Sequence, residues 1–288
     1  MDSAPVIESD RIVMSLRALF SSTTYHPPLP PPVAAEILAI SHSSNTDLRR
    51  VVSLLESDPM LAGAALKIAQ SPAYAPTGAR VLSLHDSVSR LGLRGVQQVV
   101  LEAALNLRIF TAPGFSAHMN RARRHSAAVA AAARALCRYA SGVDASAAFL
   151  CGLFHDVGVA ACFIAVSDSP ERYGASWSPE LANAIAEVHE SASRIIAELW
   201  RVGPDICAIL ASHHAALRVG SSHPIVAALA LAECVAEEKG CALDAPDATA
   251  RIDAKRVDVV VACECLGINP RLWKTAKADA ERAITDAH

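Results

Sequence analysis

Apolar residues recur along most of the chain at the three-to-four-residue spacing of amphipathic helices. Helix start signals accompany this spacing, because a capping side chain or an early proline precedes several of the periodic segments. The expected helices are 48–57 after Asp47, 59–70 after Asp58, 84–91 after Ser83, and a long one from Ser178 to about Trp200. Neither the alternation typical of strands nor an Asn-Gly or Asp-Gly hairpin turn is found. The pattern therefore predicts an all-α, multi-helix bundle.

One segment, FLCGLFHDVGVAACFIAV (149–166), is apolar almost all round. It is long for a strand, so we expect a single buried helix at the centre of the bundle. Arg134, Asp156 and Glu233 interrupt the longest apolar stretches, and none of these stretches reaches the roughly 18 residues that a membrane span requires. We therefore expect no membrane association.

The polarity of the chain changes near both ends. Residues 1–28 form the expected lead-in and linker, since the proline-dense HPPLPPP (26–32) cannot be helical before its last proline. Residues 29–235 carry the helical pattern of the main domain. Residues 236–288 begin with the polar LDAPDATARID, and two amphipathic helices near 253–266 and 270–285 follow. We expect this C-terminal extension to pack on the main domain.

Composition narrows the class of protein. Apolar residues make up 52% and charged residues 19%, so a sizeable core is expected, and the 5% aromatic content favours closely packed helices. A net charge of -3 provides no general attraction to nucleic acid or anionic membranes. The eight cysteines contain no CxxC pair, and the first residues do not resemble a secretory signal. These features favour the reducing cytoplasm.

Several polar residues lie on helix faces that should be buried. They are His125, His155, Asp156, His189, His213, His214 and Glu233. A buried carboxylate without a partner costs several kcal/mol, so Asp156 and Glu233 each require one. Histidines, or a metal held by histidines, would supply it, and imidazole with carboxylate suits Fe, Mn, Ni or Zn. One such histidine alone would be an ordinary core residue, but the combination predicts a converged site.

The order H…HD…H…HH…acid resembles the metal-site order of the HD superfamily, in particular its HD-GYP branch of cyclic di-GMP phosphodiesterases. The surrounding segments are similar instead to the HDOD branch of bacterial signalling modules. These segments are LPPPVAAEILAI (29–40), VVSLLESDPMLAGAALKIAQSPAYAP (51–76), SLHDSVSRLGLRGVQQVVL (83–101), AAFLCGLFHDVG (147–158) and HESASRIIAELWRVGPDICAILASHH (189–214). The resemblance covers about 29–235 and implies an all-helical regulatory relative of HD phosphohydrolases, often without activity.

The chain departs from the catalytic HD-GYP pattern at four places. Val159 follows Gly158 where that branch has a lysine, and HHAALRVG (213–220) replaces its GYP segment. Arg121 stands one turn before the first histidine, where the branch has a Glu ligand, and Glu233 replaces the final Asp. The first two changes remove groups that would hold phosphate. The last two alter metal binding without necessarily abolishing it.

Two hypotheses follow. The first, which the loss of the lysine and of the GYP segment favours, is a non-catalytic signalling module that acts through a protein partner or a bound ligand. The second is a metal-dependent phosphohydrolase for a cyclic dinucleotide or another phosphoester, with Asp156 as the candidate bridging ligand. Arg121 and Arg124 are candidate phosphate-binding groups in the second hypothesis, although arginines on a helix more often form a solvated face.

The expected partners follow from the same features. A nucleotide ligand is compatible with both hypotheses. DNA recognition is not expected, because the helix 59–70 lacks the basic residues of a recognition helix. Whether the terminal helices form a homodimer stays open.

Overall fold

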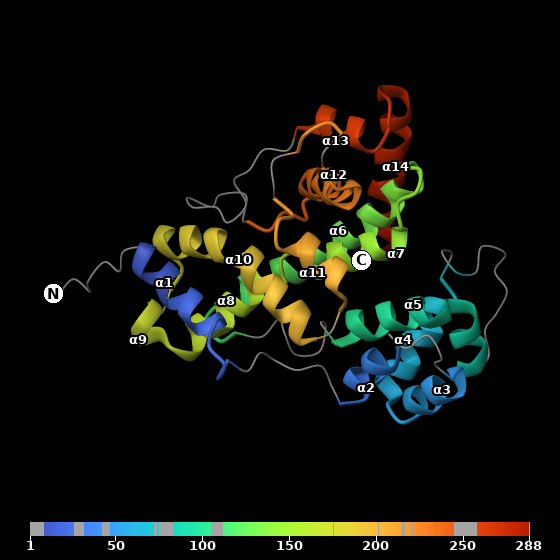
Figure 1. Cartoon of the computed structure of the whole chain (residues 1–288), viewed down its shortest axis with the longest axis horizontal. Helices are drawn as coiled ribbons and strands as arrows, with labels where there is room; N and C mark the ends of the chain where they lie inside the picture. The colour runs from blue at the N-terminus through green and yellow to red at the C-terminus, as the bar shows by residue number, and fades with distance from the viewer. Residues whose placement is uncertain are drawn as a thin grey trace. The chain divides into compact units, whose positions relative to one another are not determined.

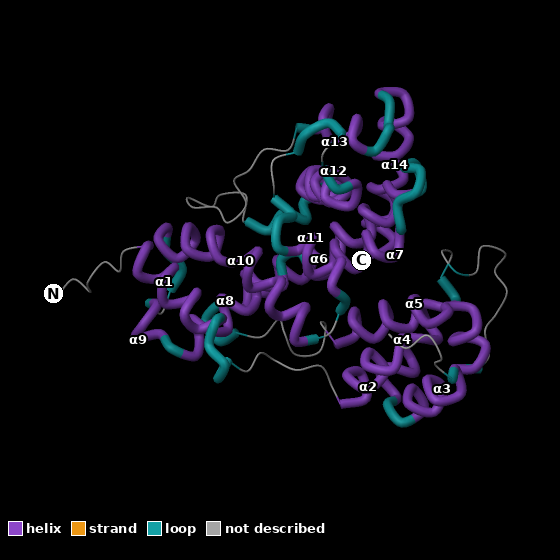
Figure 2. The backbone as a smooth tube through the Cα atoms, viewed as in Figure 1, coloured by secondary structure: helices purple, strands orange, loops and turns teal. Residues whose placement is uncertain are grey.

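The computed structural model describes residues 9–25, 32–41, 47–71, 74, 83–104, 112–174, 176–200, 202–214, 217–220, 222–244 and 258–287. These residues form helices and connecting turns without a strand, so the all-α prediction is confirmed for the described ranges (Figure 2). The chain divides into two compact units. The larger unit comprises residues 1–27, 110–199 and 203–288, and the smaller unit comprises residues 28–109 and 200–202.

The smaller unit is built around one long helix. Its helices are α2 (Pro32–Ser41), α3 (Leu48–Glu56), α4 (Pro59–Ala69) and α5 (Leu84–Ala104), and α5 packs against the other three (Figure 1). Asp47 caps α3 by accepting a hydrogen bond from the amide of Arg49 at 2.9 Å, as its position predicts. The predicted helix 84–91 ends at a kink in α5, where Gly92 adopts a φ of 64° that favours glycine.

The larger unit contains the remaining helices. They are α1 (Ser9–Phe20), α6 (Ser116–Cys137), α7 (Ala145–Phe154), α8 (Val157–Asp168), α9 (Pro170–Tyr173), α10 (Pro179–Leu199), α11 (Pro204–Leu210), α12 (Pro224–Glu238), α13 (Val259–Cys265) and α14 (Pro270–Ala287). The helix α6 packs against α7, α8, α12 and α14, and α10 packs against α1, α8 and α11 (Figure 1). The C-terminal helix α14 thus lies against the helices that also surround the site described below.

Small residues allow two of these helices to approach closely. A Cβ atom added to Gly152 of α7 would lie 2.7 Å from the Cα of Ala130 on α6. No side chain fits into that space, so the alanine-rich composition of α6 is matched by glycine on its neighbour. This close packing positions the end of α7, where His155 follows.

The prediction of one central helix over 149–166 is wrong. The chain forms α7 and α8 instead, separated by a turn at His155 and Asp156. Asp156 leaves the helical region of backbone space, with φ -107° and ψ 16°. The stretch Ala145–Asp168 is apolar and long enough to cross a membrane, but most of it is buried inside the protein.

Candidate metal centre

The seven residues singled out in the sequence converge within the larger unit. His125 lies on α6, His155 and Asp156 lie in the turn between α7 and α8, His189 lies on α10, His213 and His214 follow α11, and Glu233 lies on α12. All are buried except His214, which is partly buried. Five separate segments of the chain therefore contribute side chains to one place in the core.

The turn that carries His155 and Asp156 is held by a buried serine of α10. The hydroxyl of Ser193 donates to the carbonyl oxygen of His155 at 2.6 Å and accepts from the amide of Gly158 at 2.9 Å. These two bonds satisfy the backbone groups that the break in the helix would otherwise leave unpaired. Consecutive residues in a continuous helix point about 100° apart. The turn instead lets both side chains of the pair reach the same site.

Gly158 allows α10 to approach this turn. An added Cβ atom would overlap the carbonyl oxygen of His189 and would lie 2.6 Å from the amide nitrogen of Ser193. The same close approach brings His189 of α10 next to Asp156. The glycine after the HD pair is thus a requirement of packing.

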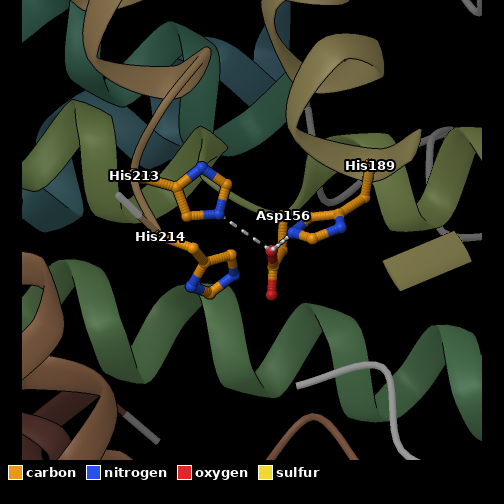
Figure 3. Close-up of side chains that lie close together, drawn as sticks. All are labelled: Asp156, His189, His213 and His214. Carbon is orange, nitrogen blue, oxygen red and sulfur yellow. Dashed lines mark ion pairs between the residues drawn. The ribbon is translucent and has the colours of Figure 1, made fainter. Parts of the chain in front are cut away.

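The two carboxylate oxygens of Asp156 face two different groups of histidines. Its Oδ2 lies 3.2 Å from Nε2 of His155 and 3.6 Å from Nε2 of His125. Its Oδ1 lies 3.5 Å from Nε2 of His213 and 3.6 Å from Nε2 of His189, as Figure 3 shows. Asp156 consequently lies between the two groups with one oxygen toward each.

Four of these histidines present the same ring nitrogen to the site. In each, Nδ1 lies within hydrogen-bonding distance of a backbone carbonyl, which can only accept, so Nδ1 carries a proton. The acceptors for His125, His155, His189 and His213 are the carbonyl oxygens of Cys241, Gly152, Ala186 and Leu210, at 2.9, 2.8, 2.9 and 2.9 Å. Because this bond fixes the tautomer and orients each ring, Nε2 is left as the atom that could bind a metal.

Glu233 and His214 complete the cluster. Oε1 of Glu233 lies 3.6 Å from Nε2 of His155, and Oε2 lies 4.0 Å from Nδ1 of His214. The backbone amide of His214 donates to Oε1 of Glu190 at 2.9 Å, which holds the segment after α11 against α10. Glutamate is one methylene longer than aspartate, and the carboxylate of Glu233 extends toward His155 in one group of histidines and His214 in the other.

Burial and mutual charge shift the pKa values of the histidines in opposite directions. Burial, reinforced by the charge of His155, lowers the pKa of His125 to about 4. Burial and the charge of His213 lower the pKa of His214 to about 2. Burial alone would also lower the pKa of His155, but the charge and hydrogen bond of Asp156 raise it to about 9.

His155 therefore carries a second proton at neutral pH when no metal is bound. Its Nε2 lies 3.2 Å from Nε2 of His125 and 3.2 Å from Oδ2 of Asp156. Two unprotonated ring nitrogens this close would repel, so one of them carries a proton or both bind a cation. In the metal-free protein His155 carries this proton. The charge of His155 also helps to hold the pKa of Asp156 well below its ordinary value, although burial alone would raise it.

The donor set fits divalent metal ions. The ligand atoms form two groups, and within each group all of them lie within 4.8 Å of one another. The first group is His125, His155 and Asp156, and the second is Asp156, His189, His213 and His214. Oδ1 of Asp156 and Nε2 of His189 and His213 are buried and have no hydrogen-bond partner among the described residues. Such atoms are costly unless they bind a ligand. Imidazole and carboxylate donors suit Mn, Fe, Ni or Zn.

The two candidate phosphate-binding arginines of α6 differ in position. Arg124 is exposed to solvent. Arg121 is partly buried, and its Nε is buried without a hydrogen-bond partner among the described residues. Arg121 shares the face of α6 that carries His125, whereas Arg124 does not. Val159, at the position of the lysine in the catalytic branch, is fully buried.

Ser193 and Glu190 were not singled out in the sequence, although both hold site segments in place. Glu190 follows His189 directly, and this position next to a candidate site residue is the sequence feature that could have indicated its role. Ser193 lies four residues after His189 on the same face of α10. Its role depends on a turn that the apolar pattern of 149–166 did not indicate.

A family model for the HDOD domain matches residues 27–216. No curated protein matches the chain. Solved structures that share the fold at low sequence identity include the following three. A candidate metal-dependent phosphohydrolase from Shewanella amazonensis SB2B has 19% identity and a TM-score of 0.76, with 97% of this chain and 98% of that chain covered.

The other two structures have comparable similarity. An HDOD domain protein of unknown function from Geobacter sulfurreducens has 19% identity and a TM-score of 0.64, with 98% and 99% covered. A candidate signal transduction protein from Marinobacter aquaeolei VT8 has 21% identity and a TM-score of 0.62, with 96% of this chain and 63% of that chain covered. Because the family model spans more than half of the chain, this protein belongs to the HDOD domain family.

Proposed function

We propose that the protein is an HDOD domain protein that holds divalent metal ions at Asp156 and acts on a phosphoester. One observation carries the proposal. Two groups of Nε2 atoms, each oriented by a hydrogen bond from Nδ1 to the backbone, face the two oxygens of one buried carboxylate. A purely structural core would have little reason to bury this many ionisable groups without complete hydrogen bonding.

The expected chemistry is hydrolysis at phosphorus. Metal ions held by this donor set would polarise a phosphoryl oxygen and activate a water molecule. Asp156 would contribute to both groups of ligands. The bonds of the Nδ1 atoms to the backbone would keep the rings oriented throughout a reaction.

His155 would respond to metal binding through its proton. A metal ligand must be deprotonated, and the pKa of His155 is raised to about 9 without metal. Binding at neutral pH would therefore release a proton from this ring.

One observation favours a second candidate function, a regulatory module without turnover. Val159 is fully buried where the catalytic branch has a lysine, so this position offers no group for phosphate. In that role the centre would bind a metal or a phosphorylated ligand, and a signalling protein would be the partner. Cytoplasmic location is part of both proposals.

The test uses the full chain and its Asp156→Asn variant, with Asp168→Asn as the control. Asp168 is an exposed aspartate at the end of α8. Metal content is measured by elemental analysis after purification and after loading with Mn, Fe, Ni or Zn. Proton release on metal binding is measured by calorimetry in buffers of different ionisation enthalpy. Hydrolysis is assayed with cyclic dinucleotides and a generic phosphodiester.

We expect the parent chain and Asp168→Asn to bind metal with release of about one proton near pH 7, since His155 is then protonated. Asp156→Asn should bind at least about 100-fold more weakly. Metal binding with turnover supports the phosphohydrolase. Metal binding without turnover supports the regulatory module. A parent chain that binds no metal under any of these conditions contradicts the phosphohydrolase.

A further inference from the structure

Three polar residues form one stripe along α6. His118, Arg121 and His125 lie at positions i, i+3 and i+7, so they share one face of the helix. Side chains on a helix lean toward its N-terminus. Arg121 is therefore placed over the turn that carries His118, between that residue and the candidate metal centre at His125.

One nitrogen of the Arg121 guanidinium lacks an acceptor among the described residues. Its Nε is buried and has no hydrogen-bond partner among the residues that the structure describes. His118 lies three residues before Arg121 on the same face of α6, and burial together with the positive charge of Arg121 lowers the pKa of His118. A buried donor without an acceptor destabilises the unliganded protein. A planar guanidinium in this condition is suited to an incoming phosphate, which it can bind through two parallel hydrogen bonds.

A stack of aromatic rings begins one turn from Arg121. The rings of His118 and Trp177 have centroids 4.6 Å apart with planes at 31°, and those of His118 and Phe163 have centroids 5.2 Å apart with planes at 38°. Phe115 extends the stack, with its ring centroid 5.1 Å from that of Phe163. Phe115 and Phe163 are buried, whereas His118 and Trp177 are partly exposed. The accessible end of the stack can therefore accept another flat ring.

We propose that this stripe is a nucleotide-binding site, in which Arg121 binds the phosphate and the His118–Trp177 end of the stack binds the base. The proposal deepens the proposed function, because it places the phosphate next to the candidate metal centre. The seven residue steps from His118 to His125 rise about 10 Å along the helix, which is comparable to the length of a nucleoside monophosphate. Stacking on aromatic rings tolerates any base, so we expect little discrimination among bases.

Arg121 would then replace the missing lysine. The catalytic branch has its lysine at the position of Val159, which is buried here. Arg121 lies on α6, one turn before His125, whereas the position of the lysine lies on α8. The stripe thus provides a phosphate-binding group from α6 and not from α8. The adjacent aromatic stack binds the base of the same ligand.

Binding is measured by isothermal titration calorimetry with AMP, adenosine and inorganic phosphate, on metal-stripped and on Mn-loaded full-length protein. We expect AMP to bind at least about tenfold more tightly than either fragment, because it engages both parts of the stripe. Arg121→Met should weaken AMP and phosphate binding by at least about tenfold. Trp177→Leu should weaken AMP and adenosine binding but leave phosphate binding unchanged. Arg123→Ala, an exposed arginine of α6, is the matched control and should behave as the parent chain.

A second measurement separates loss of binding from loss of folding. Since the buried Nε of Arg121 has no acceptor, Arg121→Met should unfold at the same temperature as the parent chain or higher when no ligand is present. The parent chain, in contrast, should gain thermal stability when AMP is added. A marked drop in the unfolding temperature of Arg121→Met would contradict the unpaired state of this side chain.

The outcomes distinguish this inference from the proposed function. AMP binding that depends on Arg121 in metal-stripped protein supports the nucleotide site even if no hydrolysis is found. Equal AMP affinity in the parent chain and Arg121→Met, or AMP binding no tighter than phosphate, overturns the nucleotide site. In that case metal content and hydrolysis of a generic phosphodiester would still decide the proposed function.

Discussion

The two units of this protein use the same secondary structure but bury different chemical groups. In the described part of the smaller unit, the buried polar residues are Ser87 and Gln98, which are both neutral. The larger unit buries six ionisable side chains in one cluster around Asp156. Gln98 accepts a hydrogen bond from the hydroxyl of Tyr74 at 3.4 Å, whereas Oδ1 of Asp156 has no hydrogen-bond partner among the described residues.

The two units thus bury side chains for two different purposes, namely stability in both units and the formation of a site in the larger one. Apolar burial stabilises both units, and a few neutral polar groups with partners add little cost. Buried charges are expensive to desolvate, and apolar replacements of similar size often increase stability. The larger unit therefore gives up stability for its site, and the smaller unit has no comparable cost.

The largest expected effect is that of acid on the metal-free protein. Burial lowers the pKa values of His125, His189 and His214 below their ordinary value of 6.5, so the unfolded chain takes up protons that the folded chain does not. Between pH 6.5 and about 4 the free energy of unfolding should fall as pH falls. The loss should exceed about 3 kcal/mol, because the shift of His125 alone accounts for about that much.

His155 contributes the opposite dependence. Its pKa is raised to about 9, so its stabilising contribution is complete below pH 6.5 and is lost as pH rises through about 9. Native-state hydrogen exchange as a function of pH checks both effects. Amides of α6 and α10 should lose protection on either side of neutrality, whereas amides of α5 should change less. If amides of α5 lost protection with pH as strongly as those of α6 and α10, the proposed difference between the two units would be wrong.

A methyl group added at Gly158 should have the next largest effect. The new Cβ would overlap backbone atoms of α10, so Gly158→Ala should lower the free energy of unfolding by about 3 kcal/mol. The control is Gly63→Ala in α4, where nothing lies within 4 Å of the added atom. That change should raise stability by about 0.5–1 kcal/mol, since alanine favours a helix more than glycine. Urea unfolding measures both, and a Gly158→Ala variant of parental stability would contradict the close packing.

Replacing the buried serine of each unit with alanine should change stability by less than the glycine substitution does, and the loss should be larger in the larger unit. Ser193→Ala leaves the carbonyl of His155 and the amide of Gly158 without their partner, and should cost about 2 kcal/mol. It should also weaken metal binding, because it releases the turn that carries Asp156. Ser87→Ala removes only a local bond to the carbonyl of Ser83, and should change stability by less than about 1 kcal/mol. Similar losses for both variants would show that Ser193 has no special role.

Surface ion pairs should contribute equally little in both units. Arg17–Glu187 in the larger unit and Arg50–Glu36 in the smaller unit are both 2.8 Å long and more than a third exposed. Arg17→Ala and Arg50→Ala should each change the free energy of unfolding by less than about 1 kcal/mol, and high salt should reduce even this difference. A loss of about 2 kcal/mol or more in either variant would point to a contribution beyond the exposed pair.

The structure confirms those sequence predictions that depended on short-range pattern. Asp47 and Asp58 cap the helices that they precede, since capping involves only residues within one turn. His125 was expected to face inward because it shares a stripe with Val129 and Leu136, and all three are buried.

The break between α7 and α8 could not be predicted in this way. The apolar pattern of 149–166 is compatible with one helix, and no proline interrupts it. The break is stabilised by Ser193, which lies 38 residues from His155 in the sequence. Such a contact exists only once α10 has packed against α8.

The sequence by itself determined which segments are helices and which side chains face inward, because periodicity and capping act within a few residues. Only the tertiary structure decided how the inward groups meet. It directed one oxygen of Asp156 to each group of histidines, and it fixed the ring of His125 through a carbonyl 116 residues away. It also left Nε of Arg121 without an acceptor among the described residues, one turn from a stack of aromatic rings. These features depend on distances between helices that are remote in the sequence, and local preferences carry no information about those distances.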